Sequence, residues 1–387
     1  MGKKIPTSVS FNLPDGKEVT IETGKLATQA HGSVVVRIED TMILATIVSA
    51  YEPRENAAFF PLSVDYQEKY AAVGRIPGNF FRRETRLNDY EILISRLVDR
   101  AIRPLFPDGY MHDTQVILTL HSSDQRNLPD AYAALAASAA IVVSDINWNG
   151  PISEVRVAKI NGEYVVNPEK EALESAELEI IVAATMDNVM MVEGEANECQ
   201  EADLIEAIKV GHEAIKVQCK AQLELAQLVG EAATVKRVLP EAPSSDEAFA
   251  LVKEVTTDKI IAVAHGAMDK VTRKDALKAI KSELKEAAAE KGDEWMAEHG
   301  SFISAYFDKH KKATLREVVM SEKVRLDGRA TDQVRPIWTE VDYLPAAHGS
   351  AIFNRGETQA LASLTLGTKL DKKMEDTALA QTYEKFM

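Results

Sequence analysis

Cysteine, long apolar runs and positive charge are all scarce in this chain. Only two of its 387 residues are cysteines, Cys199 and Cys219. Their spacing makes neither a CxxC pair nor a metal-ligand cluster, which favours two reduced thiols in a cytoplasmic protein. The longest nearly apolar run, 131–143, is well short of the roughly 20 residues that a spanning helix needs. No apolar segment follows Lys3 and Lys4, so we expect neither a secretory signal nor a membrane partner.

The deficit of positive charge limits the kinds of partner that the protein can have. The chain has 45 lysines and arginines against 60 aspartates and glutamates, a net charge of −15. A surface this acidic repels nucleic acid as a whole, which excludes a general polyanion binder with a basic tail. The 45% of hydrophobic and 27% of charged residues are typical of a folded globular protein.

The first two hundred or so residues have the pattern of strands with a few helices. Helical periodicity predicts helices over about 88–105, 129–144 and 202–228. The second of these is crowded with alanine, and so smooth a helix can lie close against a sheet. Runs rich in β-branched residues predict strands at 18–22, 33–39, 42–49, 59–66, 115–121 and 178–184.

The pattern changes after a linker that starts at Pro240. From Asp246 to about Val319 apolar residues recur at helical spacing among lysines and glutamates, which predicts a small helical domain. We interpret its charges as a solvated face and not as a binding site. Strand patterns return at 337–343, 350–353 and 358–366. The predicted domains are therefore 1–235, 240–319 and 320–387.

A short segment of the first domain recurs near residue 350. Ala30-His31-Gly32-Ser33 reappears as Ala347-His348-Gly349-Ser350, an offset of 317 residues (348 − 31). The same offset pairs Asp40-Thr41 with Glu357-Thr358, and each pair leads into an apolar strand. Duplication explains this better than chance. The third segment is thus predicted to be the start of a second, incomplete copy of the first domain.

One window of the acidic chain is rich in arginine. Residues 75–103 hold seven arginines, no lysine and four carboxylates, a local net charge of +3. A planar guanidinium suits phosphate and stacks on bases. Within the window, Phe80 and Phe81 precede Arg82 and Arg83 in a loop rich in glycine and proline. These residues could stack on bases and hold a single-stranded backbone, or the rings could be core anchors and the arginines surface ion pairs.

The same residues carry a resemblance to a known family. The run 74–84, continued in 95–107, closely resembles the bacterial polynucleotide phosphorylase family. Further segments resemble the two RNase PH-like domains of that family: 59–62, 127–130, 149–151 and 211–213 in the first, and 325–329, 348–350 and 355–359 in the second. The resemblance implies an α+β fold. It consists of an RNase PH-like domain (ribosomal protein S5 domain 2-like), an all-α helical domain, and the start of a second RNase PH-like domain.

The resemblance also implies an activity. Members of this family degrade single-stranded RNA from the 3′ end, using inorganic phosphate to release nucleoside diphosphates with the help of Mg²⁺ or Mn²⁺. They form homotrimers around a channel, and components of an RNA degradosome are further candidate partners. By match, Phe80, Phe81, Arg82 and Arg83 would grip RNA at the channel constriction. Arg100 and Arg103 would be additional RNA-backbone contacts.

The resemblance assigns no catalytic or metal-binding residue to this chain. It implies that the phosphate pocket and the metal ligands lie beyond residue 387, so the chain alone is expected to be inactive. His212-Glu213 begins an HExxH pattern that Lys216 breaks, so His212 is predicted to be a helix residue. A non-catalytic RNA-binding or scaffold subunit remains the alternative. Residues after about Leu370 are expected to be ordered only if they pack on the first domain.

Overall fold

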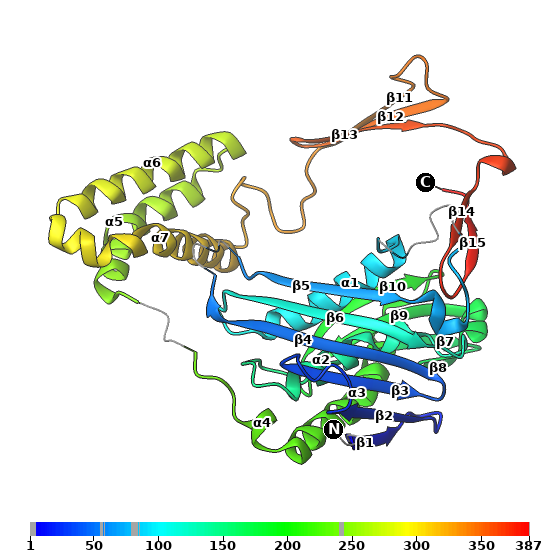
Figure 1. Ribbon diagram of the computed structural model, residues 1–387. Helices are drawn as coiled ribbons and strands as arrows, with labels where there is room; N and C mark the ends of the chain where they lie inside the picture. Colours follow the sequence, from blue (N-terminus) through cyan, green and yellow to red (C-terminus); the bar gives the residue numbers. More distant parts are fainter. Residues whose placement is uncertain are drawn as a thin grey trace. The chain divides into compact units, whose positions relative to one another are not determined.

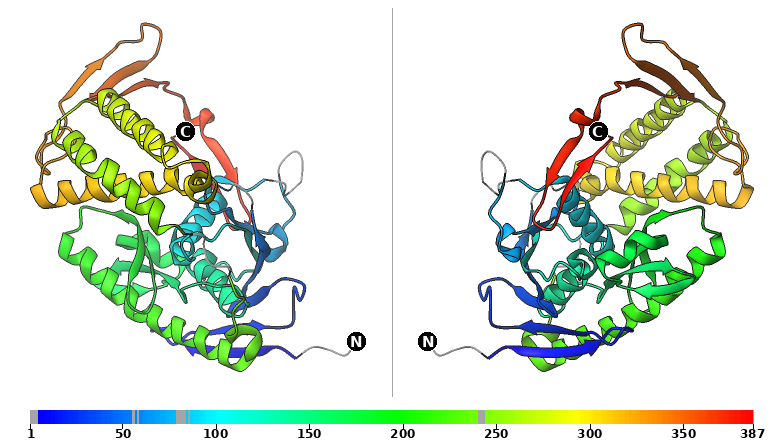
Figure 2. Two further views of the ribbon diagram at one scale, coloured as in Figure 1. Left: turned by 90° about the vertical axis from the view of Figure 1, so that its left-hand side faces the viewer. Right: turned by 90° about the vertical axis from the view of Figure 1, so that its right-hand side faces the viewer.

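The computed structural model describes residues 5–54, 57, 59–78, 84, 86–239 and 244–386. These residues form two compact units (Figures 1 and 2). Unit 1 is Met1–Pro240 together with Asp371–Met387, and unit 2 is Glu241–Leu370. Among the described residues, no helix is both long and apolar enough to cross a membrane.

A six-stranded sheet forms one layer of unit 1, in the order β1-β2-β3-β4-β6-β5. All neighbouring strands are antiparallel except β5 and β6, which are parallel. Burial alternates along β6, so one face of this strand lies in the core. The strands are β1 (Thr7–Asn12), β2 (Glu18–Thr23), β3 (Gly32–Ile38), β4 (Thr41–Pro53), β5 (Leu62–Glu68) and β6 (His112–Ser122).

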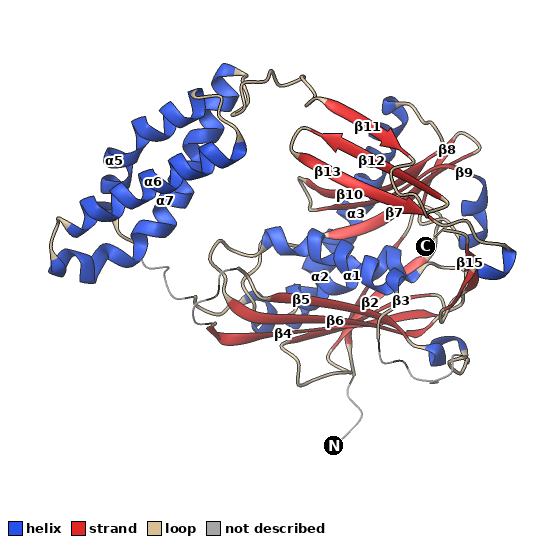
Figure 3. Cartoon of the chain, turned by 90° about the horizontal axis from the view of Figure 1, so that it is seen from above, coloured by secondary structure: helices blue, strands red, loops and turns tan. Residues whose placement is uncertain are grey.

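Two helices, α1 (Asp89–Ile102) and α2 (Ala133–Val142), cover this sheet (Figure 3). Every residue of α2 is buried, and the helix contacts β3 and β4 on one side and the second sheet on the other. The approach to β3 is very close, because a Cβ atom on Gly32 would lie 1.9 Å from the carbonyl oxygen of Ala140. The alanine-rich helix thus packs closely against the sheet, as its small side chains predict.

The second sheet of unit 1 has four antiparallel strands in the order β10-β9-β7-β8. They are β7 (Ser153–Ile160), β8 (Glu163–Val166), β9 (Ala176–Ala184) and β10 (Val189–Ala196). The long helix α3 (Glu201–Val229) packs on β7 and β9, and the short α4 (Glu231–Thr234) follows it. A Cβ on Gly211 of α3 would lie only 3.0 Å from the Val157 side chain. The sequence patterns missed β1, β7, β8 and β10.

Unit 2 begins with three helices, α5 (Asp246–His265), α6 (Lys270–Ala289) and α7 (Asp293–Glu322). Ser245 and Asp269 cap the first two by accepting hydrogen bonds from backbone N–H groups. The helices share a core that includes Ile260, Leu284 and Phe307. The helical segment predicted from the sequence is therefore confirmed.

A three-stranded antiparallel sheet follows in unit 2, built from β11 (Ile337–Val341), β12 (Gly349–Arg355) and β13 (Thr358–Leu364). Its hairpin reproduces that of β3 and β4 residue for residue, because Gly349 pairs with Leu364 as Gly32 pairs with Ile47. The repeat extends to the histidine. Ser49 N–H donates to His31 Nδ1 at 3.0 Å, and Leu366 N–H donates to His348 Nδ1 at 3.0 Å. The duplication inferred from the sequence is thus present in the hydrogen bonding.

The chain then returns to unit 1 as a hairpin of β14 (Lys373–Asp376) and β15 (Gln381–Glu384). Tyr70 OH donates to the Asp376 carbonyl oxygen at 2.5 Å, and Ala378 is buried. We expected the residues after about Leu370 to be ordered only if they pack on the first domain, and this segment does pack on it. As a result, 371–387 belongs with unit 1 and 320–370 with the helices, whereas the sequence grouped 320–387 together.

Candidate nucleic-acid interface

Helix α1 begins at a capping box that also fixes it to the sheet. Glu91 N–H donates to Asn88 Oδ1 at 2.8 Å, and Asn88 N–H donates to Glu91 Oε2 at 2.7 Å. The other carboxylate oxygen of Glu91 accepts from Glu68 N–H of β5 at 2.8 Å. Ser95 Oγ accepts from Tyr66 N–H one turn later. These bonds hold the helix, and therefore its arginines, in one rotation against β5.

The three arginines of the predicted helical stripe line one groove between α1 and β5. The groove has a volume of about 330 Å³. Arg96, Arg100 and Arg103 supply its positive charge, and Asp65 and Asp99 supply its negative charge. The spacing of four and then three residues places the arginines on one face of the helix, as the sequence predicts.

Arg103 has its donors engaged by protein groups. It forms a bidentate ion pair with Asp99, at 2.8 Å from Nε and 2.6 Å from a terminal nitrogen. The guanidinium also donates to the carbonyl oxygens of Phe60 and Leu62, and it lies over the Phe60 ring at 5.5 Å. This arrangement ties α1 to the segment before β5. The structure therefore gives Arg103 a structural role, and its predicted RNA contact would require these bonds to break.

Arg100 and Arg96 have fewer protein partners than Arg103, so their guanidinium groups are more available to a ligand. Arg100 makes one ion pair, with Glu193 at 3.1 Å, and both side chains are about half exposed. Such a pair contributes little to stability and can exchange for a phosphate. Arg96 is exposed and has no ion-pair partner among the residues described. Contact of Arg100 with an RNA backbone remains a prediction, and Arg96 is the neighbour that sequence reasoning left out of the site.

Phe80, Phe81, Arg82 and Arg83 lie outside the described residues, but both flanks of their loop are anchored. On the flank before them, Arg75 pairs with Asp376 at 2.7 Å and donates to the Thr377 carbonyl oxygen at 2.9 Å.

On the flank after them, Glu84 accepts a hydrogen bond from Tyr70 N–H at 2.7 Å and pairs with Lys69 at 3.4 Å. Tyr70 is therefore a common attachment point, because its hydroxyl also reaches Asp376. Arg75, one of the seven arginines of the basic window, is thus engaged by the chain after Leu370.

A buried network of acidic side chains lies within unit 1, and no sequence pattern indicated it. Tyr66 OH donates to Glu68 Oε1 at 2.9 Å, and burial raises the pKa of Glu68 to about 7. Ala134 N–H donates to Glu154 Oε1 at 2.6 Å, and burial raises the pKa of Glu154 to about 8. Arg156 pairs with Asp130. These side chains lie on β5, on β7 and before α2, and the bonds named here are to other protein groups, which indicates a structural role.

The described residues contain no group of three or more histidines, cysteines, aspartates or glutamates arranged to hold a metal ion. His212 lies on helix α3, and its ring nitrogen Nε2 is 3.0 Å from the carbonyl oxygen of Thr185. This contact fits the expectation that His212 is a helix residue.

Comparison with known families defines the class of the protein. Residues 15–147 match "3' exoribonuclease family, domain 1" and residues 150–214 match domain 2 of the same family. Residues 248–330 match "Polyribonucleotide nucleotidyltransferase, RNA binding domain". The first match covers strands β2 to β6 of the six-stranded sheet together with α1 and α2, the second covers the four-stranded sheet, and the third covers the helices of unit 2 from residue 248 onward. The chain thus matches both domain models of the 3′ exoribonuclease family, which confirms the predicted RNase PH-like α+β fold.

Relatives in curated collections give the particular family. The chain is 51% identical over 383 residues to the polyribonucleotide nucleotidyltransferase of Bacteroides fragilis, covering 99% of this chain and 53% of that protein. The Phocaeicola vulgatus protein of the same name is 51% identical, with the same coverage. The Porphyromonas gingivalis protein is 49% identical over 380 residues, covering 98% of this chain and 50% of that protein. The chain belongs to the polyribonucleotide nucleotidyltransferase family and spans about half the length of these relatives.

A solved structure is also similar, at lower identity. It is a chain of the Archaeoglobus fulgidus exosome with RNA bound to the active site. The similarity has a TM-score of 0.42 at 19% identity, and it covers 53% of this chain and 90% of that chain.

Proposed function

We propose that the whole protein is a phosphate-dependent 3′-to-5′ exoribonuclease that releases nucleoside diphosphates from single-stranded RNA. The observation that carries this proposal is the 51% identity over 99% of the chain to a polyribonucleotide nucleotidyltransferase. The order of the three matched domains supports it.

The described residues support a role in holding RNA. Arg96 and Arg100 project from a helix whose rotation is fixed, and Arg75 and Glu84, on either side of Phe80, Phe81, Arg82 and Arg83 in the sequence, are held by other parts of unit 1. A guanidinium binds a phosphodiester through two parallel N–H donors, and an aromatic ring stacks on any base. Such contacts grip a strand without selecting its sequence. This chain would therefore hold the strand while its 3′ end reacts elsewhere.

The phosphorolytic step has phosphate attack the terminal phosphodiester, so the 3′ nucleotide leaves as a diphosphate. A divalent ion, Mg²⁺ or Mn²⁺, would offset the charge on the phosphoryl group. The described residues do not fit such an ion, because they contain no suitable group of ligands. We propose that the catalytic residues lie in the half of the protein outside this chain.

We propose a cytoplasmic homotrimer that has RNA and inorganic phosphate as its substrates and that takes part in an RNA degradosome. The scarcity of cysteine, with Cys199 and Cys219 not bonded to each other, supports that compartment. Buried in the core, Cys219 has its pKa raised to about 12, which makes it an inert thiol.

The activity is tested by incubating poly(A) with phosphate and magnesium and measuring ADP. We expect ADP from the whole protein and none from residues 1–387. ADP from residues 1–387 would show that the catalytic residues are in this chain. RNA binding by the whole protein without any ADP would favour the alternative, a non-catalytic RNA-binding or scaffold subunit.

The loop is tested by the double substitution Arg82→Ala and Arg83→Ala. This substitution removes two cationic side chains, so RNA binding should weaken. The salt dependence of the RNA affinity should also fall, because fewer counterions are released on binding. The matched control is Arg37→Ala with Arg126→Ala, two exposed arginines that pair with carboxylates elsewhere on unit 1. An equal effect of both pairs would show that only overall charge matters.

A further inference from the structure

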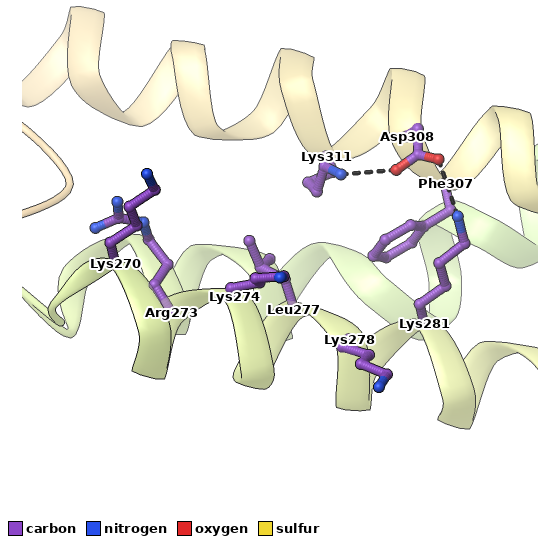
Figure 4. A pocket seen from close by; sticks show the side chains of 9 residues that line it. All are labelled: Lys270, Arg273, Lys274, Leu277, Lys278, Lys281, Phe307, Asp308 and Lys311. Atoms are coloured by element: carbon purple, nitrogen blue, oxygen red, sulfur yellow. Dashed lines mark hydrogen bonds and ion pairs between the residues drawn. The ribbon is translucent and has the colours of Figure 1, made fainter. Parts of the chain in front are cut away.

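A basic groove runs between helices α6 and α7 of unit 2 (Figure 4). It has a volume of about 400 Å³, and six of its nine lining residues are cationic. Lys270 and Arg273 lie at one end of it, and Lys281 and Phe307 lie at the other. The lining residues are Lys270, Arg273, Lys274, Leu277, Lys278, Lys281, Phe307, Asp308 and Lys311. This concentration of positive charge is unusual in a chain whose net charge is −15.

The positive charge of the groove is only slightly neutralised. Asp308, its one carboxylate, accepts hydrogen bonds from Lys311 at 2.7 Å and from Lys281 at 2.9 Å. The bond from Lys311 lowers the pKa of Asp308, so that it stays ionised and offsets one of the two lysines. Arg273 donates to the carbonyl oxygens of Met268 and Leu326, which leave its charge in place.

Lys270, Lys274 and Lys278 are exposed and have no carboxylate partner among the described residues. They follow one another at intervals of four residues, about 6 Å along the helix. The intervals keep all three on one side of α6. A row of unpaired cations at regular spacing suits a linear polyanion better than a single small anion.

The floor of the groove offers no surface for base stacking. Phe307 is buried in the core of the three helices, and the ammonium groups of Lys281 and Lys311 lie over its ring at 5.5 and 5.4 Å. Its face is therefore occupied by cations from the protein itself. A strand in this groove would be held through its phosphates, with no preference for sequence.

We propose that this groove binds the phosphodiester backbone of single-stranded RNA. The proposal rests on the proposed function, and it goes further by locating a second RNA contact on unit 2, separate from the arginine window of unit 1. It also revises the sequence-based interpretation that the charges of the helical domain are a solvated face and not a binding site. The match of 248–330 to an RNA binding domain supports RNA as the occupant, and the lysines of α6 give that domain a defined binding face.

The test measures binding of a fluorescent oligo(A) to the whole protein by anisotropy, between 50 and 200 mM KCl. The groove variant is Lys270→Ala, Lys274→Ala and Lys278→Ala together. The matched control is Lys253→Ala, Lys291→Ala and Lys309→Ala, three exposed lysines of unit 2 that do not line the groove. Each phosphate contact contributes about 0.7 to the salt slope, so the groove variant should lose about 2 units of slope and about tenfold in affinity at low salt.

Equal losses in the groove and control variants would overturn the proposal, as would a wild-type protein that binds no RNA. A groove variant that loses binding to phosphatidylserine vesicles while keeping RNA binding would also overturn it. The ADP assay on the same wild-type preparation separates the two proposals. A selective loss in the groove variant without any ADP would uphold the groove and refute the phosphorolytic function. Abundant ADP together with equal losses of RNA binding in the groove and control variants would refute the groove and uphold the phosphorolytic function.

Discussion

The hairpin of β3 and β4 and its repeat in β12 and β13 have the same register but very different surroundings. Val36 is 1% exposed, whereas its counterpart Phe353 is 45% exposed. Ile47 is 0% exposed, whereas its counterpart Leu364 is 49% exposed. The pairing of the strands is therefore a local property of the repeated sequence, and their burial is a property of the elements that pack against them.

The glycine that starts each hairpin shows what the second copy lacks in this structure. In the first copy, α2 comes so close that a Cβ on Gly32 would lie 1.9 Å from the Ala140 carbonyl oxygen. In the second copy, a Cβ on Gly349 would meet only the Leu364 side chain, at 3.7 Å. The repeat thus keeps a residue whose small size is needed only beneath a closely packed helix.

The largest contrast is expected from truncating matched side chains of the two hairpins. Ile47→Ala should destabilise unit 1 by about 2–5 kcal/mol, because it leaves a cavity in a closed core. Leu364→Ala should cost less than about 1 kcal/mol, because half of the side chain is already in water. Hydrogen exchange of the sheet amides measures both costs. Equal values would mean that the second hairpin is covered in solution.

The two glycines give the next contrast. Gly32→Ala should cost about 1–3 kcal/mol, because the new methyl group overlaps the backbone of α2 and forces it to move. Gly349→Ala should change stability by less than about 0.5 kcal/mol. Chemical denaturation monitored separately for each unit checks this, and a costly Gly349→Ala would contradict the open environment of the second copy.

The histidine of the first copy, His31, makes the stability of unit 1 depend on pH. Burial lowers the pKa of His31 below its usual 6.5, and the nearby Arg237 adds to the shift. Stability from this group is therefore present above the unfolded pKa and is lost as the pH falls from there through the folded pKa. His31→Gln should remove that pH dependence and cost about 1 kcal/mol at neutral pH, since Ser49 N–H loses its acceptor.

The matched change is His348→Gln, at an exposed histidine that accepts from Leu366 N–H in the same geometry. It should cost less than about 0.5 kcal/mol. Unfolding of each variant between pH 5 and pH 8 provides the measurement. A pH dependence of unit 1 that survives His31→Gln would assign it to other groups, such as Glu68.

The smallest effect is expected where the chain after the second hairpin meets unit 1. Asp376→Asn removes the charge that faces Arg75 and should cost about 0.5–1 kcal/mol, because the pair is partly exposed. The exchange protection of β14 and β15 should fall as the hairpin opens more often. Lys373→Ala serves as the control, because its contact with unit 1 is the longer pair with Asp89 at 3.4 Å and its other pair, with Glu375 at 2.5 Å, lies within β14. It should leave the protection nearly unchanged.

The sequence predicted those features that depend on local patterns. Asn88 and Glu91 stand three residues apart before an apolar stripe, so the start of α1 was visible in the residues. The repeat around His31 and His348 predicted a hairpin that the structure reproduces down to one hydrogen bond. The arginines of α1 were correctly placed on one face, because helical spacing alone determines that.

Features that depend on distant partners could not be predicted. Strand β7 carries Glu154 and Arg156, which read as exposed residues, yet both are buried because Asp130, Glu179 and a backbone amide of α2 receive them. The role of Arg75 depends on Asp376, 301 residues later. The charge of Arg103 suggested RNA, but the bonds that engage it come from Asp99 and from two carbonyl groups before β5.

Because β14 and β15 return to unit 1, the whole of unit 2 acts as a covalent tether between the two segments of unit 1. The chain leaves unit 1 at Pro240 and rejoins it at Asp371, so the attachment of the hairpin is an intramolecular event. Its effective concentration is set by the tether and not by the amount of protein. A single proteolytic cut between β13 and β14, within 365–372, would convert it into a bimolecular association that weakens on dilution. The contacts of Arg75 with Asp376 and Thr377 therefore depend on the covalent continuity of a unit that does not itself contribute to them.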